Sequence, residues 1–169
     1  MPFARHDVEQ AVWDSMGKGG IQNSRNRFIT GDYTAENTRT SSWRSTYSRD
    51  RLKLDVLIRK VARRFAAENC TIVVCRMLMQ PTSYGSISLS GLQYLENRYV
   101  VIQNGQNGPL PDLGQTTTIS CYLEVERQNT RAGVHPPGIL KNYEINAWTN
   151  LVADRAQILE NLLLERATC

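Results

Sequence analysis

The stretch from residue 21 to residue 48 most limits what this chain can fold into. It consists largely of Asn, Thr, Ser and Arg, contains few aliphatic side chains, and shows no apolar period of 2 or 3.6. A segment of this kind buries too little apolar surface to offset the conformational entropy that it loses on ordering. We therefore predict an extended N-terminal arm that becomes ordered only against another surface, and a core built from the residues that follow.

Two segments outside the arm have the spacing of amphipathic helices. In residues 49–68 the apolar side chains recur at intervals of 3 and 4, and so do those of residues 143–166. Both segments are predicted to be helices that turn one apolar face to the core. A shorter helix is predicted over residues 7–17, where Asp7 is placed to cap the N-terminus and Gly17 ends the helix.

The middle of the chain has the composition of β-strands. Residues 71–79 are apolar almost throughout, as in a central strand, and Pro81 with Gly85 is predicted to form the turn that follows. Three more strands are predicted, and they cover residues 86–90, 94–102 and 116–127. In the last of them the odd-numbered side chains from Ile119 to Val125 are apolar and turn to one side.

These elements predict an α+β fold. The expected architecture is a single small domain with a four-stranded, mostly antiparallel sheet packed against two amphipathic helices, preceded by a short helix and an extended N-terminal arm. The short helix and the polar, basic arm occupy residues 1–48, and the globular α+β domain occupies residues 49–169. A chain of 169 residues is long enough to bury one real core.

Positive charge is concentrated in the first part of the chain. The whole sequence carries 20 Lys and Arg against 16 Asp and Glu, and residues 1–66 alone hold 13 of the former and 7 of the latter. Basic side chains interleaved with aromatic rings are typical of surfaces that neutralise phosphates and stack on unpaired bases. We predict contact with nucleic acid, RNA or another single strand, through Arg25, Arg27, Arg39, Arg44, Arg49, Lys53, Lys60, Arg63 and Arg64.

The aromatic side chains of the arm are open to other interpretations. An arm that lies across a neighbouring subunit needs aromatic anchors and Arg donors, because they combine buried area with forked hydrogen bonding. An arm packed on its own domain would use the same side chains. Self-packing, intersubunit packing and nucleic-acid contact therefore all stay open. The predicted anchors are Phe28, Tyr33, Trp43, Tyr47 and, in the C-terminal segment, Trp148.

The side chains that catalysis or metal binding would need are scarce and badly spaced. Only His6 and His135 could supply an imidazole, and the four cysteines lack the close spacing of zinc and redox motifs. The sequence contains no phosphate-binding glycine loop and no nucleophile elbow. We therefore name no catalytic residue, no metal ligand and no cofactor, and we expect no small-molecule substrate.

The start of the chain and its hydropathy bear on location. The first seven residues lack the apolar segment of a secretory signal, and no apolar run approaches the roughly 20 residues that cross a bilayer. We expect an intracellular protein that is not secreted, found in the virion if it is viral.

These features favour a non-enzymatic structural protein that assembles with copies of itself. A capsid-like or matrix-like viral protein would use the arm for its neighbours and the basic side chains for nucleic acid. Three alternatives stay open. They are a dimeric regulatory protein that sequesters RNA, a peripheral protein on an anionic membrane, and an enzyme of unknown type. The membrane alternative would use Lys53, Lys60, Arg63 and Arg64.

Overall fold

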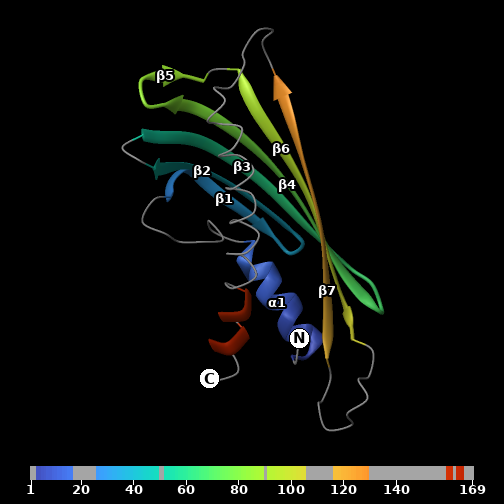
Figure 1. Cartoon of the computed structure of the whole chain (residues 1–169). Helices are drawn as coiled ribbons and strands as arrows, with labels where there is room; N and C mark the ends of the chain where they lie inside the picture. The colour runs from blue at the N-terminus through green and yellow to red at the C-terminus, as the bar shows by residue number, and fades with distance from the viewer. Residues whose placement is uncertain are drawn as a thin grey trace.

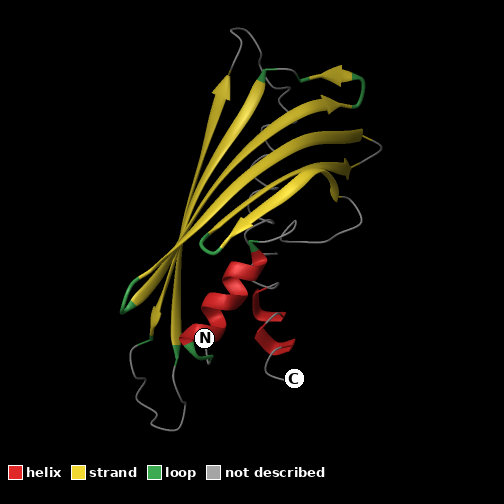
Figure 2. Cartoon of the chain, turned by 180° about the vertical axis from the view of Figure 1, so that it is seen from behind, coloured by secondary structure: helices red, strands yellow, loops and turns green. Residues whose placement is uncertain are grey.

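The computed structural model describes residues 3–16, 26–49, 52–89, 91–105, 116–129, 159–161 and 163–165. Its main element is one antiparallel sheet, which Figures 1 and 2 show as a curved layer with helical segments on one side. The elements are α1 (Arg5–Ser15), β1 (Asn26–Ala35), β2 (Thr38–Arg49), β3 (Leu52–Ala66), β4 (Cys70–Tyr84), β5 (Ile87–Ser88), β6 (Leu92–Asn104) and β7 (Thr117–Asn129). The strands follow the order β1-β2-β3-β4-β6-β7, and the short β5 pairs with β4.

Residues 49–68 do not form the predicted helix. They contain β3, which pairs with β2 along one edge and with β4 along the other. Every second side chain from Leu54 to Ile58 is buried, and Lys60 continues this period of 2 on the same face. The charge of Lys60 hides the alternation in the sequence, while apolar residues of the opposite face, such as Leu57, create intervals of 3 and 4. Backbone pairing on both edges selects the strand over the helix.

The predicted N-terminal arm is a β-hairpin of the sheet. Residues 26–49 form β1 and β2, and β2 pairs with β3 along its whole length. A polar segment can join a sheet because the neighbouring strand satisfies its backbone hydrogen bonds, and because only one of its faces needs to be buried. On that face Trp43 and Ser45 are buried. The prediction that this segment cannot order within its own subunit is therefore wrong.

The other strand predictions are partly confirmed. β4 contains the predicted residues 71–79 but continues through Pro81 to Tyr84, so Pro81 is not part of the predicted turn. The turn lies at Gly85, which has a φ of 59°. The pairing register of β4 with β3 shifts beside Pro81, and a pairing irregularity is where a strand tolerates proline. The predicted third and fourth strands correspond to β6 and β7, and all pairings are antiparallel.

The helix predictions are also only partly correct. The short N-terminal helix is present as α1, but its N-cap is Ala4 and no side chain caps it, so the cap predicted at Asp7 is wrong. Of the predicted helix over 143–166, the structure describes residues 159–161 and 163–165, which are helical. The expected four-stranded sheet against two amphipathic helices is wrong. The described residues form a seven-stranded sheet with one complete helix, because residues 26–66 supply three strands instead of an arm and a helix.

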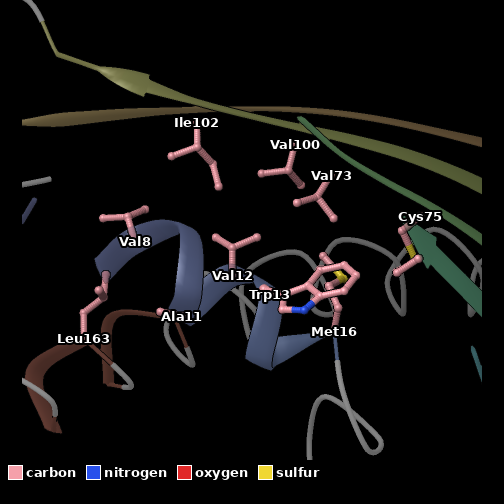
Figure 3. Close-up of a cluster of buried hydrophobic side chains, with 11 residues drawn as sticks. Val8, Ala11, Val12, Trp13, Met16, Val73, Cys75, Val100, Ile102 and Leu163 are labelled. Atoms are coloured by element: carbon pink, nitrogen blue, oxygen red, sulfur yellow. The ribbon is translucent and has the colours of Figure 1, made fainter. Parts of the chain in front are cut away.

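The core lies between α1 and one face of the sheet. Figure 3 shows the apolar side of α1 directed at β4 and β6, with Leu163 of the C-terminal segment completing the cluster. Its buried members from α1 are Val8, Ala11, Val12 and Trp13, and those from the sheet include Ala62, Val73, Cys75, Val100 and Ile102. A second apolar cluster includes Trp43, Ile58, Met77, Met79, Leu92 and Tyr94.

Polar contacts hold α1 on the sheet at both ends. Near the C-terminus of α1, the guanidinium of Arg39 lies 4.7 Å from the ring centroid of Trp13 and donates to the Trp13 carbonyl at 2.5 Å. Arg39 also pairs with Asp14 at 3.3 Å. Nearer the start of α1, the hydroxyl of Thr71 donates to the carboxylate of Glu9 at 2.8 Å. These contacts fix the position of the helix along the strands.

Replacing Trp13 by Ala is expected to lower the free energy of unfolding by about 3–5 kcal/mol, because the change leaves a cavity between α1 and the sheet. The side chain of Trp13 is only 3% exposed. Urea unfolding followed by circular dichroism measures the difference. The matched control is His6→Ala on the exposed side of α1, which should change stability by less than about 0.5 kcal/mol. A Trp13→Ala variant as stable as the parent chain would contradict the packing described.

Candidate nucleic-acid interface

The two faces of the sheet are covered differently. α1 and the C-terminal segment pack on the face that carries Val73, Cys75 and Ile102. No described element packs on the opposite face, here called the open face. Side chains on the open face alternate along the strands with those of the covered face, and among them Val61 and Tyr99 are exposed while Leu95 of β6 is buried. The described elements therefore leave the open face uncovered.

Three arginines form a diagonal row across the open face. Arg44 of β2 lies opposite Leu57 of β3, and Arg76 of β4 lies opposite Val61 of β3. Arg59 is between Leu57 and Val61 along β3. Each arginine is thus one strand across and two residues along from the last, which separates neighbouring positions by roughly 7–8 Å. All three arginines are exposed, and none forms an ion pair with another residue that the structure describes.

An aromatic pair lies at the end of this diagonal row. Because Arg76 is opposite Asn97, the next step of one strand and two residues reaches Tyr99 of β6. Its ring centroid is 6.0 Å from that of Tyr122 on β7, and the two planes are inclined by 47°. Tyr99 is 42% exposed and Tyr122 is 59% exposed, so both rings are open to solvent. Exposed rings of this kind can stack on unpaired bases.

The centre of the open face is hollowed. A hollow of about 850 Å³ has an apolar floor that includes Leu57, Leu78 and Leu95. Arg59 and Arg76 also line it. Polar groups from Thr40, Ser42, Gln93 and Gln128 line it too. An apolar floor with cationic and amide groups around it suits a planar polar ring better than a purely apolar ligand.

Carboxylates occupy two places on the described open face, one beside Arg44 and Lys53 and one on β7. The hydroxyls of Thr46 and Ser83 donate to the carboxylate of Asp55 at 2.6 and 3.1 Å. The Thr46 hydrogen bond, with help from Ser83 and nearby cations, lowers the pKa of Asp55 against the opposing effect of burial. The other carboxylates, Glu124 and Glu126, lie on β7 at the edge of the sheet, away from the strands that carry the arginine row.

The structure distributes the predicted cations over both faces. Arg44, Lys53 and Arg63 are exposed on the open face. Arg39, Lys60 and Arg64 point to the face that α1 covers: Arg39 and Arg64 lie over the ring of Trp13, and Lys60 lies 5.4 Å from the ring centroid of Trp43. Arg25 lies outside the described residues. For Arg27 and Arg49 the structure describes only their places on β1 and β2.

The predicted aromatic anchors lie elsewhere than expected. Trp43 is buried in the second apolar cluster, where it packs against its own subunit. Phe28, Tyr33 and Tyr47 belong to β1 and β2, and Trp148 lies outside the described residues.

The sequence prediction missed four residues of the open face: Arg59, Arg76, Tyr99 and Tyr122. A period of 2 applied to residues 52–66 would have grouped Arg59 with Lys53 and Arg63.

The covered face contains a buried charge cluster between the two apolar clusters. Arg98 donates to Glu96 at 2.6 Å, and both side chains are almost fully buried. Burial raises the pKa of Glu96, although Arg98 and Lys60 oppose the shift. Burial also raises the pKa of the Cys75 thiol to about 11. A thiol that stays protonated is a poor nucleophile, and the described residues contain no group of His, Cys, Asp and Glu that could hold a metal ion.

Replacing Glu96 by Leu is expected to destabilise the protein by about 3–5 kcal/mol, because it leaves the Arg98 guanidinium buried without this carboxylate. The double variant Glu96→Leu/Arg98→Met removes both charges and should recover most of that loss. Chemical denaturation of the parent and both variants measures the effect. Equal destabilisation by the single and double variants would show that the ion pair is not what the cluster requires.

Alkylation with iodoacetamide should proceed at different rates at Cys75 and Cys121. At pH 8 a thiol with a pKa near 11 is ionised about a hundredfold less than one with a pKa near 9, so buried Cys75 is expected to resist iodoacetamide. Exposed Cys121 should react readily. Peptide mass spectrometry after a short labelling pulse on the native protein checks both, with labelling in denaturant as the control. Rapid labelling of Cys75 in the native state would contradict its burial.

Comparisons with known proteins give no match. No family model matches the chain, and neither a curated protein nor a solved structure matches it significantly. In the part of the chain that the structure describes, no helix is long and apolar enough to cross a membrane.

Proposed function

We propose that this chain is a non-enzymatic protein that binds single-stranded nucleic acid on its open face and assembles with copies of itself, as a capsid-like or matrix-like viral structural protein does. The observation that supports the nucleic-acid part is the diagonal row of Arg44, Arg59 and Arg76 leading to Tyr99 and Tyr122. Assembly can no longer rest on a free N-terminal arm, because that segment forms β1 and β2.

The chemistry of the row suits a nucleic-acid strand. The guanidinium groups of Arg44, Arg59 and Arg76 can donate forked hydrogen bonds to successive phosphates, since each lies roughly 7–8 Å from the next position. The rings of Tyr99 and Tyr122 can stack on bases at the end of the same path. The cations can therefore contact the phosphate of a nucleotide, and the rings on the same surface can contact its base.

The shape of the open face favours a single strand over a duplex. Reading a duplex groove requires a helix or a narrow two-stranded ribbon that protrudes into it. The open face is instead one side of a broad curved sheet, and no described element protrudes from it, so unpaired bases can lie and stack on it. The hollow lined by Leu78, Gln93 and Gln128 offers a base an apolar floor and amide groups for its edge.

The alternatives have less support. A membrane patch made of Lys53, Lys60, Arg63 and Arg64 is divided between two opposite faces of the sheet, with Lys60 buried, so the four cannot meet one lipid surface. A regulatory RNA-binding protein would use the same open face and differs from the proposal in lacking higher assembly. The enzyme alternative would be supported by His135, a carboxylate and a thiol in one pocket, and His135 lies outside the described residues.

Removing the arginine row should weaken binding to a fluorescent single-stranded oligonucleotide. The slope of log affinity against log salt is negative. For Arg59→Gln/Arg76→Gln, we expect its magnitude to decrease by about 1.4, or about 0.7 for each lost phosphate contact. Tyr99→Ala should cost about 1–3 kcal/mol of binding free energy with little change in this slope, because it removes stacking. Fluorescence anisotropy at several salt concentrations, with RNA and DNA of the same sequence, measures both.

The matched control is Arg127→Gln, which removes one positive charge from the opposite side of β7. Arg127 is exposed and lies opposite Tyr94, a residue of the covered face. Affinity should stay close to that of the parent chain. The proposed interface is wrong if the control and the double variant weaken binding equally, or if the parent chain binds a duplex as tightly as a single strand.

A further inference from the structure

β7 ends the sheet with an edge that no described strand pairs with, as Figure 1 shows. The strand is 13 residues long, and it pairs with β6 from Thr117 to Asn129 without a register shift. It contains no proline and no lysine. Edge strands are usually protected by short length, a bulge, a proline or charged side chains, especially lysine, and of these features β7 has only the charges of Glu124, Glu126 and Arg127. β7 is therefore built to accept a further strand.

The opposite edge of the sheet differs. β1 pairs with β2 irregularly, with register shifts between Phe28 and Thr30 and between Thr30 and Tyr33. Irregularities of this kind twist an edge and interrupt its row of backbone hydrogen-bonding groups. The two edges thus differ in their ability to pair with a further strand, and of the two only β7 offers a long regular row of backbone donors and acceptors.

The side chains of β7 are incompletely covered on both faces. On the side of α1, Cys121 is exposed and Leu123 is half-buried, whereas Cys75 in the interior of the same face is 1% exposed. On the open face Tyr122 is exposed. A strand placed beside β7 would cover Cys121 and Leu123 on the side of α1 and would satisfy the backbone groups at the same time.

We propose that two copies of the chain pair antiparallel through β7, about a two-fold axis at Leu123, and form one continuous sheet of twelve strands, two copies of the six-strand path. Residue 123 is the centre of the strand, so this register pairs all 13 residues. The inference deepens the assembly part of the proposed function, and it rests on the strand edge and not on nucleic-acid binding.

Charge supports the same register. With the axis at Leu123, Glu124 lies opposite Tyr122 of the second copy and Glu126 lies opposite its Ser120, so no two carboxylates face each other. An axis at Glu124 or Val125 would place carboxylates directly opposite, which destabilises paired strands. An axis at Tyr122 avoids this conflict but pairs fewer residues. On the side of α1, Leu123 meets its own copy and extends the apolar stripe.

The two-fold arrangement keeps equivalent faces together. Because the axis is perpendicular to the sheet, odd-numbered residues of β7 meet odd-numbered residues of the partner, and both α1 helices lie on one side. The two open faces then join into one surface. Glu124 and Glu126 of both copies gather at its centre, and the two arginine rows lie on the flanks, so a nucleic-acid strand would run along each flank.

The first test measures the mass of nuclease-treated protein by light scattering across a dilution series. The parent chain is expected to be a dimer, and Leu123→Lys should raise its dissociation constant roughly tenfold or more, because two like charges meet at the axis. Thr118→Lys is the matched control. Its site lies opposite Gln128 of the second copy and about 34 Å from the second Thr118 site, ten residues away along the strand. The change brings no like charges together, so it should raise the dissociation constant much less than Leu123→Lys does. Circular dichroism confirms that each variant folds.

The second test uses disulfide formation and stands even if Leu123→Lys fails to fold. In a Cys121→Ser background, Leu123→Cys should form a disulfide-linked dimer on mild oxidation, since the paired Cα atoms would be about 4.5–5.5 Å apart. Thr118→Cys in the same background should not. A monomeric parent chain, or equal cross-linking of both cysteine variants, would overturn the pairing. If the parent chain is a monomer that still binds the oligonucleotide, the β7 pairing is wrong and the proposed interface stands. If it is a dimer that does not bind the oligonucleotide, the proposed interface is wrong and the β7 pairing stands.

Discussion

Backbone pairing along both edges of β3 is the constraint on which the rest of the structure depends. β3 lies between the β1–β2 hairpin and β4, and its register with both is what assigns each side chain to one of two faces. Successive side chains of a strand point to opposite sides, so one face of β3 can be apolar while the other is basic. A helix over the same residues would have put Lys53, Lys60, Arg63 and Arg64 on one surface, and the strand separates them.

The same alternation places the residues that stabilise the fold on one face of the sheet and those of the proposed interface on the other. On one face the apolar side chains of β4 and β6 pack against α1, and Arg39 and Arg64 close over Trp13. On the other face the arginines of β2, β3 and β4 stay exposed, because no described element needs that surface for packing. A surface on which no other element packs can carry many charged side chains with little loss of stability. The proposed interface can therefore coexist with a well-packed core that is formed by the neighbouring residues of the same strands.

Much of the sheet could be predicted from the sequence, and its extent could not. The apolar run of β4 and the alternation of β7 identify strands directly, since both patterns are unambiguous. β1 and β2 have no such pattern, and their pairing uses backbone hydrogen bonds that almost any sequence can make. Among the side chains of the open face, the sequence identifies Arg44, Lys53 and Arg63 as nucleic-acid contacts, and only Arg44 belongs to the arginine row. Arg76, Tyr99 and Tyr122 were not, because residues from three separate strands become neighbours only through the strand register.

By itself the sequence determined the basic character of the first 66 residues, the short N-terminal helix, and the strands that correspond to β4, β6 and β7. These properties depend on composition and on contacts between residues near one another in the chain. Only the tertiary structure decided that residues 26–66 are three strands, that Lys60 is buried while Arg59 is exposed, and that Arg44, Arg59 and Arg76 lie in one row. The physical reason is that hydrogen bonding between strands depends on partners distant in the chain. The spacing of apolar residues within one segment does not show which strand it pairs with.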